Sequence, residues 1–555
     1  MERPGRLLLL SELRVRNGLY DVSLSRSVLT WKRRASSPVY HPFRPSVCHS
    51  VPVSEIISVR EEEEENGSGQ RDDGSWKKIK SREEKDCRQA FTVLYVERSR
   101  QYRWRCAEVT FACSDEAVCQ HWVTNIRELL ATNTSRPKHL LVYINPYGGK
   151  RQGKRIYEQK VAPLFTLAGI STSVIVTEYA NHARDHLRTA AELEKFDGVV
   201  CVGGDGMFSE IIHGLIWRTQ IDCGVDPNCP EEALSPCSLR IGIIPAGSTD
   251  CICFATVGTN DPVTSALHVI VGDSQALDVS SVHHNNMFLR YSVSLLGYGF
   301  YGDVLTDSER KRWMGPARYD FSGLKMFLTH HCYEGTVSYL PAGGIIGTPR
   351  DATKCRSGCV ICQHNGQLLS ERTEKYEMDE ASDSECNGEW RTIRGKFLAI
   401  NAASMSCACP RSPKGLSPAA HLADGTIDLI LVRKCSRFNF LRHLLRHTSK
   451  DDQFDLTFIE VHRVRRFRFT PRHCQSDSDL ELDLQENGKR QIFSQICKDH
   501  PACGCAPAYS SWNCDGEILT HTAIDVRVHC QLIKLFARGI EELPVFEDLT
   551  NPCAI

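Results

Sequence analysis

Four short apolar runs alternate with helical stretches between residues 138 and 278, and this alternation constrains the fold more than any other feature. The runs are Leu140–Ile144, Val174–Thr177, Val199–Val202 and Ile241–Ile244. The stretches between them are Arg155–Leu167, Ala183–Leu193 and Met207–Trp217. Strands that are apolar throughout are typical of a parallel sheet covered by helices on both faces. The pattern therefore predicts an α/β lobe whose ligand binds at the carboxyl ends of the strands.

The loops that follow these strands are suited to a polyanion. Asn145–Gly149 reads Asn-Pro-Tyr-Gly-Gly after the first strand, and Thr177–Asn181 follows the second. Pro245–Asp250 follows the fourth strand and reads Pro-Ala-Gly-Ser-Thr-Asp. Glycine lets the backbone approach a phosphate group closely. One such loop alone could be a turn without a ligand, but four at one edge of a sheet indicate a phosphate-binding site.

The third strand ends in Gly203–Gly206, which reads Gly-Gly-Asp-Gly and leads into a helix that carries Glu210. The glycines leave room for phosphate oxygens, and Asp205 stands where a hydroxyl group can be presented to it. A P-loop NTPase is excluded, because Arg155 replaces the Ser or Thr that a Walker A motif needs after Gly153-Lys154. The loop therefore predicts phosphate binding beside a catalytic carboxylate.

The glycine loops at 145–149, 203–206 and 245–248 resemble the catalytic domain shared by diacylglycerol and sphingosine kinases. Later phrases are similar to the ceramide kinase family within that group: Ser281–His284, Tyr298–Asp303, Cys407–Cys409, Leu416–Leu422 and Ser511–Glu517. The resemblance runs through nearly the whole chain, to residue 541. It implies a diacylglycerol-kinase-like fold, in which an α/β nucleotide-binding lobe with a parallel sheet precedes a mainly β second lobe.

The resemblance also implies an activity. The expected reaction moves the γ-phosphate of ATP to the primary hydroxyl of ceramide, with Asp205 as general base, Mg²⁺ on the phosphates and Ca²⁺ as a regulator. A sphingosine or diacylglycerol kinase on the same scaffold is the enzymatic alternative. A non-catalytic lipid-binding regulator is the alternative of another class, and the intact glycines around Asp205 argue against it.

Site residues follow from the resemblance position by position. The expected ATP contacts are Asn145, Pro146, Tyr147, Gly148, Gly149, Thr177, Glu178, Tyr179, Ala180, Asn181, Glu210, Arg312, Arg318, Asp515, Gly516 and Glu517. The expected lipid contacts are Gly203, Gly204, Asp205, Gly206 and Ser248. The chain departs from the family at Gly247–Cys251, which reads Gly-Ser-Thr-Asp-Cys where many relatives carry Gly-Thr-x-Asn-Asp.

Residues 1–131 are predicted to form a separate domain. Short β-type runs precede an amphipathic helix in which Val118, Trp122 and Ile126 recur every four residues, and this unit resembles a membrane-targeting pleckstrin-homology domain, a β barrel with a C-terminal helix. Trp31–Arg34, with Arg14 and Arg16, is a candidate phosphoinositide site, although basic residues on a β surface can simply be solvated. A β-rich extension without a ligand is the alternative.

The remaining boundaries follow composition. Residues 132–278 are assigned to the ATP-binding lobe and 279–541 to the β-rich lipid-binding lobe. The second lobe carries polar insertions at 342–392 and 474–490, and 542–555 form a C-terminal tail.

The first insertion contains Cys355, Cys359 and Cys362, a spacing found among zinc ligands. His364 follows too closely for usual zinc spacing, so the pattern leaves three interpretations open: a zinc site, redox-sensitive thiols and ordinary cysteines. Arg437–Lys450 is a basic amphipathic segment, which suits calmodulin, a membrane surface or ordinary packing.

The formal net charge is −1, so no general basic field is available to attract nucleic acid. Because no 18-residue apolar stretch occurs, we expect a cytoplasmic protein without a transmembrane segment, peripheral on membranes. The resemblance implies the plasma membrane or the Golgi.

Overall fold

The computed structural model describes residues 6–34, 48–62, 89–189, 191–315, 317–344, 346–368, 389–410, 412–447, 452–472 and 509–542. The predicted insertion at 474–490 lies outside these residues, as does the predicted tail after residue 542. Contacts divide the chain into two compact units. Unit 1 contains Met1–Leu140, Arg155–Ser173 and Asp261–Asp273, and unit 2 contains Leu141–Lys154, Val174–Asn260 and Ser274–Ile555.

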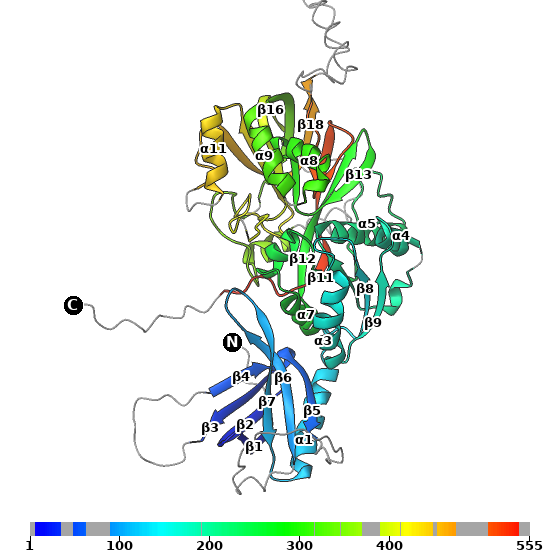
Figure 1. The fold of residues 1–555 in the computed structure, drawn as a ribbon, viewed down its shortest axis with the longest axis vertical. Helices are drawn as coiled ribbons and strands as arrows, with labels where there is room; N and C mark the ends of the chain where they lie inside the picture. The colour runs from blue at the N-terminus through cyan, green and yellow to red at the C-terminus, as the bar shows by residue number, and fades with distance from the viewer. Residues whose placement is uncertain are drawn as a thin grey trace, which may run out of the picture. The chain divides into compact units, whose positions relative to one another are not determined.

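Unit 1 contains a seven-stranded antiparallel sheet in the order β4-β3-β2-β1-β7-β6-β5 (Figure 1). Its strands are β1 (Leu7–Val15), β2 (Gly18–Ser25), β3 (Val28–Arg33), β4 (Cys48–Pro52), β5 (Ile56–Glu62), β6 (Ala90–Arg98) and β7 (Trp104–Ala112). Helix α1 (Glu116–Ala131) packs on this sheet through Trp122, which stacks on Phe91 and donates a hydrogen bond to Ser11 Oγ at 3.1 Å. The predicted β unit with a closing helix is confirmed.

Unit 1 also includes chain beyond residue 131, where the sequence placed the domain boundary. Helix α7 (Pro262–Val271) packs on β7, and the His268 ring stacks on Trp104 with centroids 3.8 Å apart. The Thr264 hydroxyl accepts the Trp104 backbone N–H at 3.0 Å and lies 3.3 Å from the Trp104 carbonyl oxygen. Trp104, Thr264 and His268 are all buried, so water is excluded from the contact between α7 and β7.

The four predicted strands of the α/β lobe are confirmed as β8 (His139–Ile144), β9 (Ser171–Val176), β10 (Gly198–Gly203) and β11 (Arg240–Pro245). β10 and β11 run parallel, from Gly198 opposite Arg240 to Gly203 opposite Pro245. Helices α4 (His182–Thr189) and α5 (Asp205–Asp222) lie side by side (Figure 1). The stretch predicted as one helix at 155–167 divides into α2 (Gly153–Ile156), a π-helical turn (Tyr157–Val161) and α3 (Ala162–Leu167).

The second lobe is mainly β, as predicted, but its strands continue the same sheet. Strand β21 (Ile524–Phe536) pairs in parallel with β11 and antiparallel with β12 (Ser274–His284) and β18 (Ile459–Pro471). The other strands are β13 (Met287–Ser292), β14 (Leu295–Gly299), β15 (Tyr333–Pro341), β16 (Arg391–Ala403), β17 (Ile427–Arg433), β19 (Asn513–Cys514) and β20 (Glu517–Ile518). Helix α6 (Cys251–Val257) precedes this lobe, and the helices within it include α8 (Phe300–Glu309), α9 (Ala317–Thr329) and α11 (Arg437–Arg446). Within the described residues, β21 therefore joins the two predicted lobes into a fourteen-stranded sheet.

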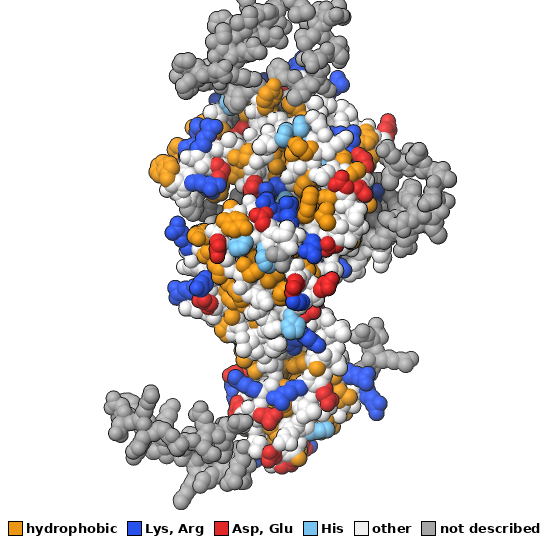
Figure 2. Space-filling model, turned by 90° about the vertical axis from the view of Figure 1, so that its right-hand side faces the viewer, with side chains coloured by type: hydrophobic (Ala, Val, Ile, Leu, Met, Phe, Trp, Pro, Cys, Tyr) orange, Lys and Arg blue, Asp and Glu red, His pale blue; other side chains and the backbone are white. Residues whose placement is uncertain are grey.

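The surface carries both signs of charge. Figure 2 shows one face on which Lys and Arg side chains are interspersed with Asp and Glu, with hydrophobic side chains between them. Among the described helices, none combines the length and the hydropathy that crossing a membrane requires.

Candidate active site

The first glycine loop is held in shape by Asn145. Its Oδ1 accepts the backbone N–H groups of Tyr147 at 2.9 Å and Gly148 at 3.0 Å, which fixes the turn after β8. Gly149 has a φ of 54°, and a Cβ there would lie 2.5 Å from the Ala246 carbonyl oxygen. Only glycine therefore fits this position, where the first loop packs against the fourth.

The third and fourth loops meet through two further glycines. A Cβ added to Gly247 would lie 2.6 Å from the Gly204 Cα and 2.4 Å from an Asp250 carboxylate oxygen. Gly206 is different, because a Cβ there would meet no atom within 4 Å. The outer glycines thus pack the loops together, and Gly206 leaves open space at the N-terminus of α5. The free N–H groups and the dipole of a helix N-terminus favour a phosphate group at such a place.

Asp205 is the first residue of α5, and its carboxylate binds the first turn of α6. Oδ2 accepts the N–H of Cys251 at 3.0 Å, and Oδ1 accepts the N–H of Ile252 at 3.0 Å. Burial raises the pKa of Asp205, the two amides offset part of the rise, and Asp515 adds to it. Each oxygen keeps a second lone pair, so a hydroxyl group can still donate a hydrogen bond to this carboxylate.

Asp250 is a second carboxyl group beside Asp205, and no role was predicted for its side chain. It is the N-cap residue of α6, it has a φ of 52°, and it is 8% exposed. Its Oδ1 accepts the Gly247 N–H at 2.9 Å. Burial, together with the negative charge of Asp205, raises the pKa of Asp250 to about 7. The signal that could have found it is a second carboxylate at the carboxyl end of the neighbouring parallel strand.

The raised pKa of Asp250 makes stability depend on pH. Between its ordinary value of 3.8 and about 7, the folded chain holds a proton that the unfolded chain releases, so this group's contribution to stability falls as pH rises. Asn is neutral at every pH. We therefore expect the melting temperature to fall less between pH 4.5 and 7.5 in Asp250→Asn than in the wild type, measured without nucleotide or Mg²⁺.

The matched control is Asp222→Asn. This substitution changes an exposed carboxylate at the C-terminal end of α5, far along the helix from Asp205. Its melting temperature should follow the wild-type pH profile. An Asp250→Asn profile as steep as that of the wild type would contradict the assignment of this titration to Asp250.

Two other carboxylates are occupied by structural hydrogen bonds. Asp515, an expected ATP contact, accepts backbone N–H groups and hydroxyls from the turn between β13 and β14 at 2.7–3.0 Å, namely from Ser292, Val293, Ser294 and Leu295. Asp303 accepts hydrogen bonds from Ser510 Oγ at 2.6 Å and from the Tyr333 hydroxyl at 2.7 Å. Both carboxylates therefore hold local structure, and Asp515 also contributes charge near Asp205.

The second loop lies against α5 through its expected ATP contacts. The Thr177 hydroxyl donates to the Ile144 carbonyl at 3.3 Å, and burial raises the pKa of Glu210 while the N–H groups of Asn181 and Ala183 lower it. Tyr179 stacks on His182 with centroids 4.6 Å apart. The expected loop contacts that lie at the surface are Tyr147, Gly149, Glu178, Tyr179, Ala180, Gly206 and Ser248.

The remaining predicted contacts lie on other elements. Arg312, in the short 3-10 helix Arg312–Met314, and Arg318, on α9, both pair with Glu309, Arg318 at 3.2 Å. Glu517 pairs with Arg290 at 2.9 Å, and the exposed Gly516 has a φ of 92° with open space around it. These residues stay predicted nucleotide contacts.

In the N-terminal sheet, the candidate phosphoinositide residues are only partly available. Trp31 is buried, and Arg34 pairs with Glu12 and, at 3.3 Å, with Asp21. Lys32 and Arg33 are exposed at the end of β3. The prediction therefore concerns these two cations more than Trp31.

Family models match three consecutive stretches of the chain. They are described as the ceramide kinase PH domain at residues 9–126, the diacylglycerol kinase catalytic domain at 139–282 and the ceramide kinase C-terminal domain at 294–553. A human protein named ceramide kinase is 60% identical over 522 residues, which cover 94% of each chain. The chain belongs to the ceramide kinase family. It is therefore a lipid kinase, and as a kinase it uses ATP.

Other members of the ceramide kinase family match along most of their length. The mouse protein named ceramide kinase is 57% identical over 93% of this chain and 94% of its own. The protein of that name from Oryza sativa subsp. japonica is 32% identical over 80% of this chain and 84% of its own. A solved diacylglycerol kinase structure from Bacillus anthracis str. Sterne is also similar: the match covers 73% of this chain and 98% of that one at 12% identity, with a TM-score of 0.41.

Proposed function

We propose that this chain transfers the γ-phosphate of ATP to the primary hydroxyl of ceramide, which gives ceramide 1-phosphate and ADP. Membership of the ceramide kinase family supports the substrate. The observation that carries the reaction is the Asp205 carboxylate, which is held by two backbone amides next to the open space at Gly206. A proton acceptor and a phosphate site thus lie at adjacent positions of one loop.

In the proposed step, the lipid hydroxyl donates a hydrogen bond to Asp205. Its oxygen attacks the γ-phosphorus as the bond to the β-phosphate oxygen breaks, the proton moves to the Asp205 carboxylate, and ADP leaves. A raised pKa suits this role, because a base with a pKa nearer the working pH accepts a proton more readily. Phosphoryl transfer depends chiefly on positioning and charge stabilisation, which the helix N-terminus and the glycine loops supply.

Magnesium is the expected partner of the ATP phosphates. Mg²⁺ is usually held by one or two carboxylates together with substrate phosphates. Asp250 fits this requirement, because burial and the nearby negative charge of Asp205 disfavour its ionised form, and a cation relieves that repulsion while Asp205 stays free to accept the lipid proton. When bound, the metal would neutralise charge that develops on the phosphates.

Substrate choice is tested with purified protein, labelled ATP and a panel of ceramide, sphingosine and diacylglycerol in the same mixed micelles. We expect kcat/KM for ceramide to exceed that for the other two lipids by at least about tenfold, a difference of 1.4 kcal/mol in transition-state binding. Equal turnover of the three lipids would contradict the assignment to ceramide and leave only a lipid kinase of broader range.

We further propose that the domain at 9–126 recruits the enzyme to membranes, with Lys32 and Arg33 as contacts to phosphoinositide headgroups. The family match to a PH domain supports lipid binding, and both side chains are exposed. We also propose that the domains end at residues 131, 278 and 541. The enzyme would be cytoplasmic and would attach peripherally to the plasma membrane or the Golgi.

A second surface could bring the kinase lobe to the bilayer. Helices α9 and α11 pack together through stacked Phe327 and Phe440, whose centroids are 6.3 Å apart. Both leave large apolar side chains exposed: Phe321, Leu324 and Leu328 on α9, and Phe438, Leu441 and Leu445 on α11. Exposed apolar patches mark interaction surfaces. Calmodulin is proposed as a partner of residues 437–450, with Ca²⁺ as regulator. Because Phe440 is buried, calmodulin would have to bind the exposed α11 side chains named above. Residues 448–450 lie outside the described chain.

A further inference from the structure

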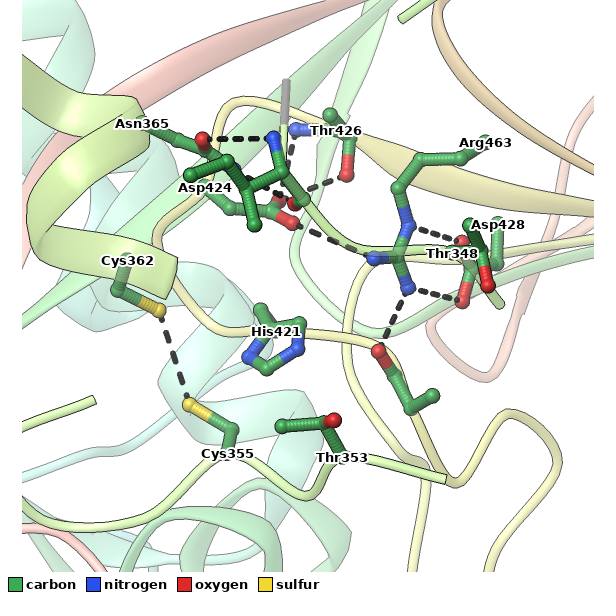
Figure 3. Close-up of polar contacts among 12 residues, drawn as sticks. Thr348, Thr353, Cys355, Cys362, Asn365, His421, Asp424, Thr426, Asp428 and Arg463 are labelled. Carbon is green, nitrogen blue, oxygen red and sulfur yellow. Dashed lines mark hydrogen bonds and ion pairs between the residues drawn. The ribbon is translucent and has the colours of Figure 1, made fainter. Parts of the chain in front are cut away.

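The three cysteines of the first insertion meet a histidine from a distant loop. Cys355 and Cys362 lie beside the ring of His421 (Figure 3), and the ligand atoms of these three residues and of Cys359 all lie within 4.8 Å of one another. Cys355 Sγ is 3.7 Å from Cys362 Sγ, and Cys359 Sγ is 3.3 Å from His421 Nδ1. His421 follows Cys359 by 62 positions and lies between β16 and β17, so spacing along the chain could not reveal it.

These distances are those of ligands around one small ion. Thiolates at about 2.3 Å from a tetrahedral zinc ion lie about 3.8 Å from each other, and about 3.5 Å from an imidazole nitrogen on the same ion. A disulfide would bring two sulfur atoms to about 2.05 Å. The separations therefore fit shared coordination and do not fit a disulfide.

Burial distinguishes His421 from His364, the histidine that lies next to the cysteines in the sequence. His421 is 1% exposed, and its Nδ1 is the ring nitrogen that faces the cluster, 3.3 Å from Cys359 Sγ. His364, two residues after Cys362, is exposed. A histidine that ligates a metal is normally fixed in one orientation, which a buried position provides and an exposed one does not.

The segments that supply the four ligands are tied to the core and to each other. Gln531 on β21 donates hydrogen bonds to the Cys362 carbonyl at 3.4 Å and to the Ala423 carbonyl at 3.2 Å. Asp278 on β12 accepts the Gly425 N–H at 2.6 Å. The two ligand-bearing segments are thus positioned by the same pair of strands, and the site is preorganised for its ion.

We propose that Cys355, Cys359, Cys362 and His421 bind one Zn²⁺ ion as a structural site. Four protein ligands close the tetrahedron and leave no position for water or substrate, which is the arrangement of structural rather than catalytic zinc. Soft thiolates with one imidazole select zinc over the magnesium that serves the nucleotide. The site is separate from the phosphate loops and adds a second metal to this enzyme.

The loop that carries His421 also reaches the residues that hold Asp205, the proposed base. The loop that carries His421 also carries Ala408, whose carbonyl accepts a hydrogen bond from Cys251 Sγ at 3.6 Å. The backbone N–H of Cys251 in turn binds Asp205. Zinc therefore holds the loop that packs on the first turn of α6, where the two amides orient Asp205.

Metal content of the purified full-length protein tests the site directly. We expect about one zinc per chain by inductively coupled plasma mass spectrometry after a chelator wash, and at least fivefold less in His421→Ala. His364→Ala is the matched control and should keep its zinc. His421→Cys should also keep it, since Cys₄ is an established zinc ligand set. A wild-type protein without zinc, one with iron instead, or loss of zinc from His364→Ala but not from His421→Ala would overturn the proposal.

A second measurement avoids any folding defect of the variants. An organomercurial titrated into native wild-type protein should release the zinc as about three thiols react, followed with a metallochromic dye. Cys229→Ser removes an exposed cysteine outside the site and should leave the zinc release unchanged. Thiol modification that releases no zinc would overturn the proposal even if His421→Ala failed to fold.

Discussion

Asp205→Asn is expected to lower kcat for ceramide by about 10²-fold or more, because the amide cannot accept the proton of the lipid hydroxyl. KM for ATP should change little, since the glycine backbone and the α5 N-terminus remain. Steady-state kinetics with ceramide and ATP varied separately measure both effects.

The substitution also has a structural cost that must be measured beside kcat. Both oxygens of Asp205 accept backbone N–H groups, from Cys251 and Ile252, and Asn can accept only one of them. The unpaired N–H should cost about 1–3 kcal/mol of stability. Thermal unfolding must therefore show that the variant is folded at the assay temperature.

Asp303→Asn is the matched control, because Asp303 is also a buried carboxylate with two hydrogen-bond donors, Ser510 and Tyr333. A similar loss of stability with far less loss of kcat would separate a base from a structural carboxylate. If Asp205→Asn keeps most of its kcat, the base must be another residue, and Asp250 would be the first to test.

Gly206→Asp should strongly weaken productive ATP binding, with KM for ATP raised at least about tenfold, or 1.4 kcal/mol. The new carboxylate would stand at the helix N-terminus where phosphate is proposed to bind, beside Asp205, and two like charges there disfavour a polyanion. Nucleotide binding by isothermal titration and KM for ATP both measure this effect.

Gly206→Ala separates charge from size. Because a Cβ at this position meets no atom within 4 Å, the alanine variant should fold and bind ATP nearly as the wild type does. Equal ATP affinity in the Asp and Ala variants would show that phosphate does not bind at this helix end.

The sequence predicted the strands and the glycine loops because both depend on local pattern. Three of the four apolar runs form buried strands, while β9 lies largely exposed at the sheet edge, and glycine is needed where backbones meet, as at Gly149 and Gly247. Asp250 was missed because its environment comes from Asp205, at the start of α5, which follows a different strand. His421 was missed because it approaches Cys359 only in the folded chain.

The partners of β21 could not be predicted from the local sequence pattern, for the same reason. An apolar strand near residue 524 could be recognised, but its partners lie hundreds of positions earlier, on β11 and β12. Hydrophobic periodicity predicts that a strand is buried, but it does not predict which strand lies beside it.

The contact between Trp104 and α7 bears on how membrane recruitment can be separated from catalysis. A chain shortened to begin at residue 132 would lose the ring on which His268 stacks and the backbone groups that bind Thr264. Helix α7 lies within the stretch matched by the diacylglycerol kinase catalytic model, so such a deletion would uncover an apolar surface of the kinase itself. If the truncated chain lost activity, aggregation of the kinase could explain the loss as well as a failure to reach the membrane. Substitutions that remove only the charges of Lys32 and Arg33 leave this contact intact, so they test membrane recruitment without disturbing the kinase fold.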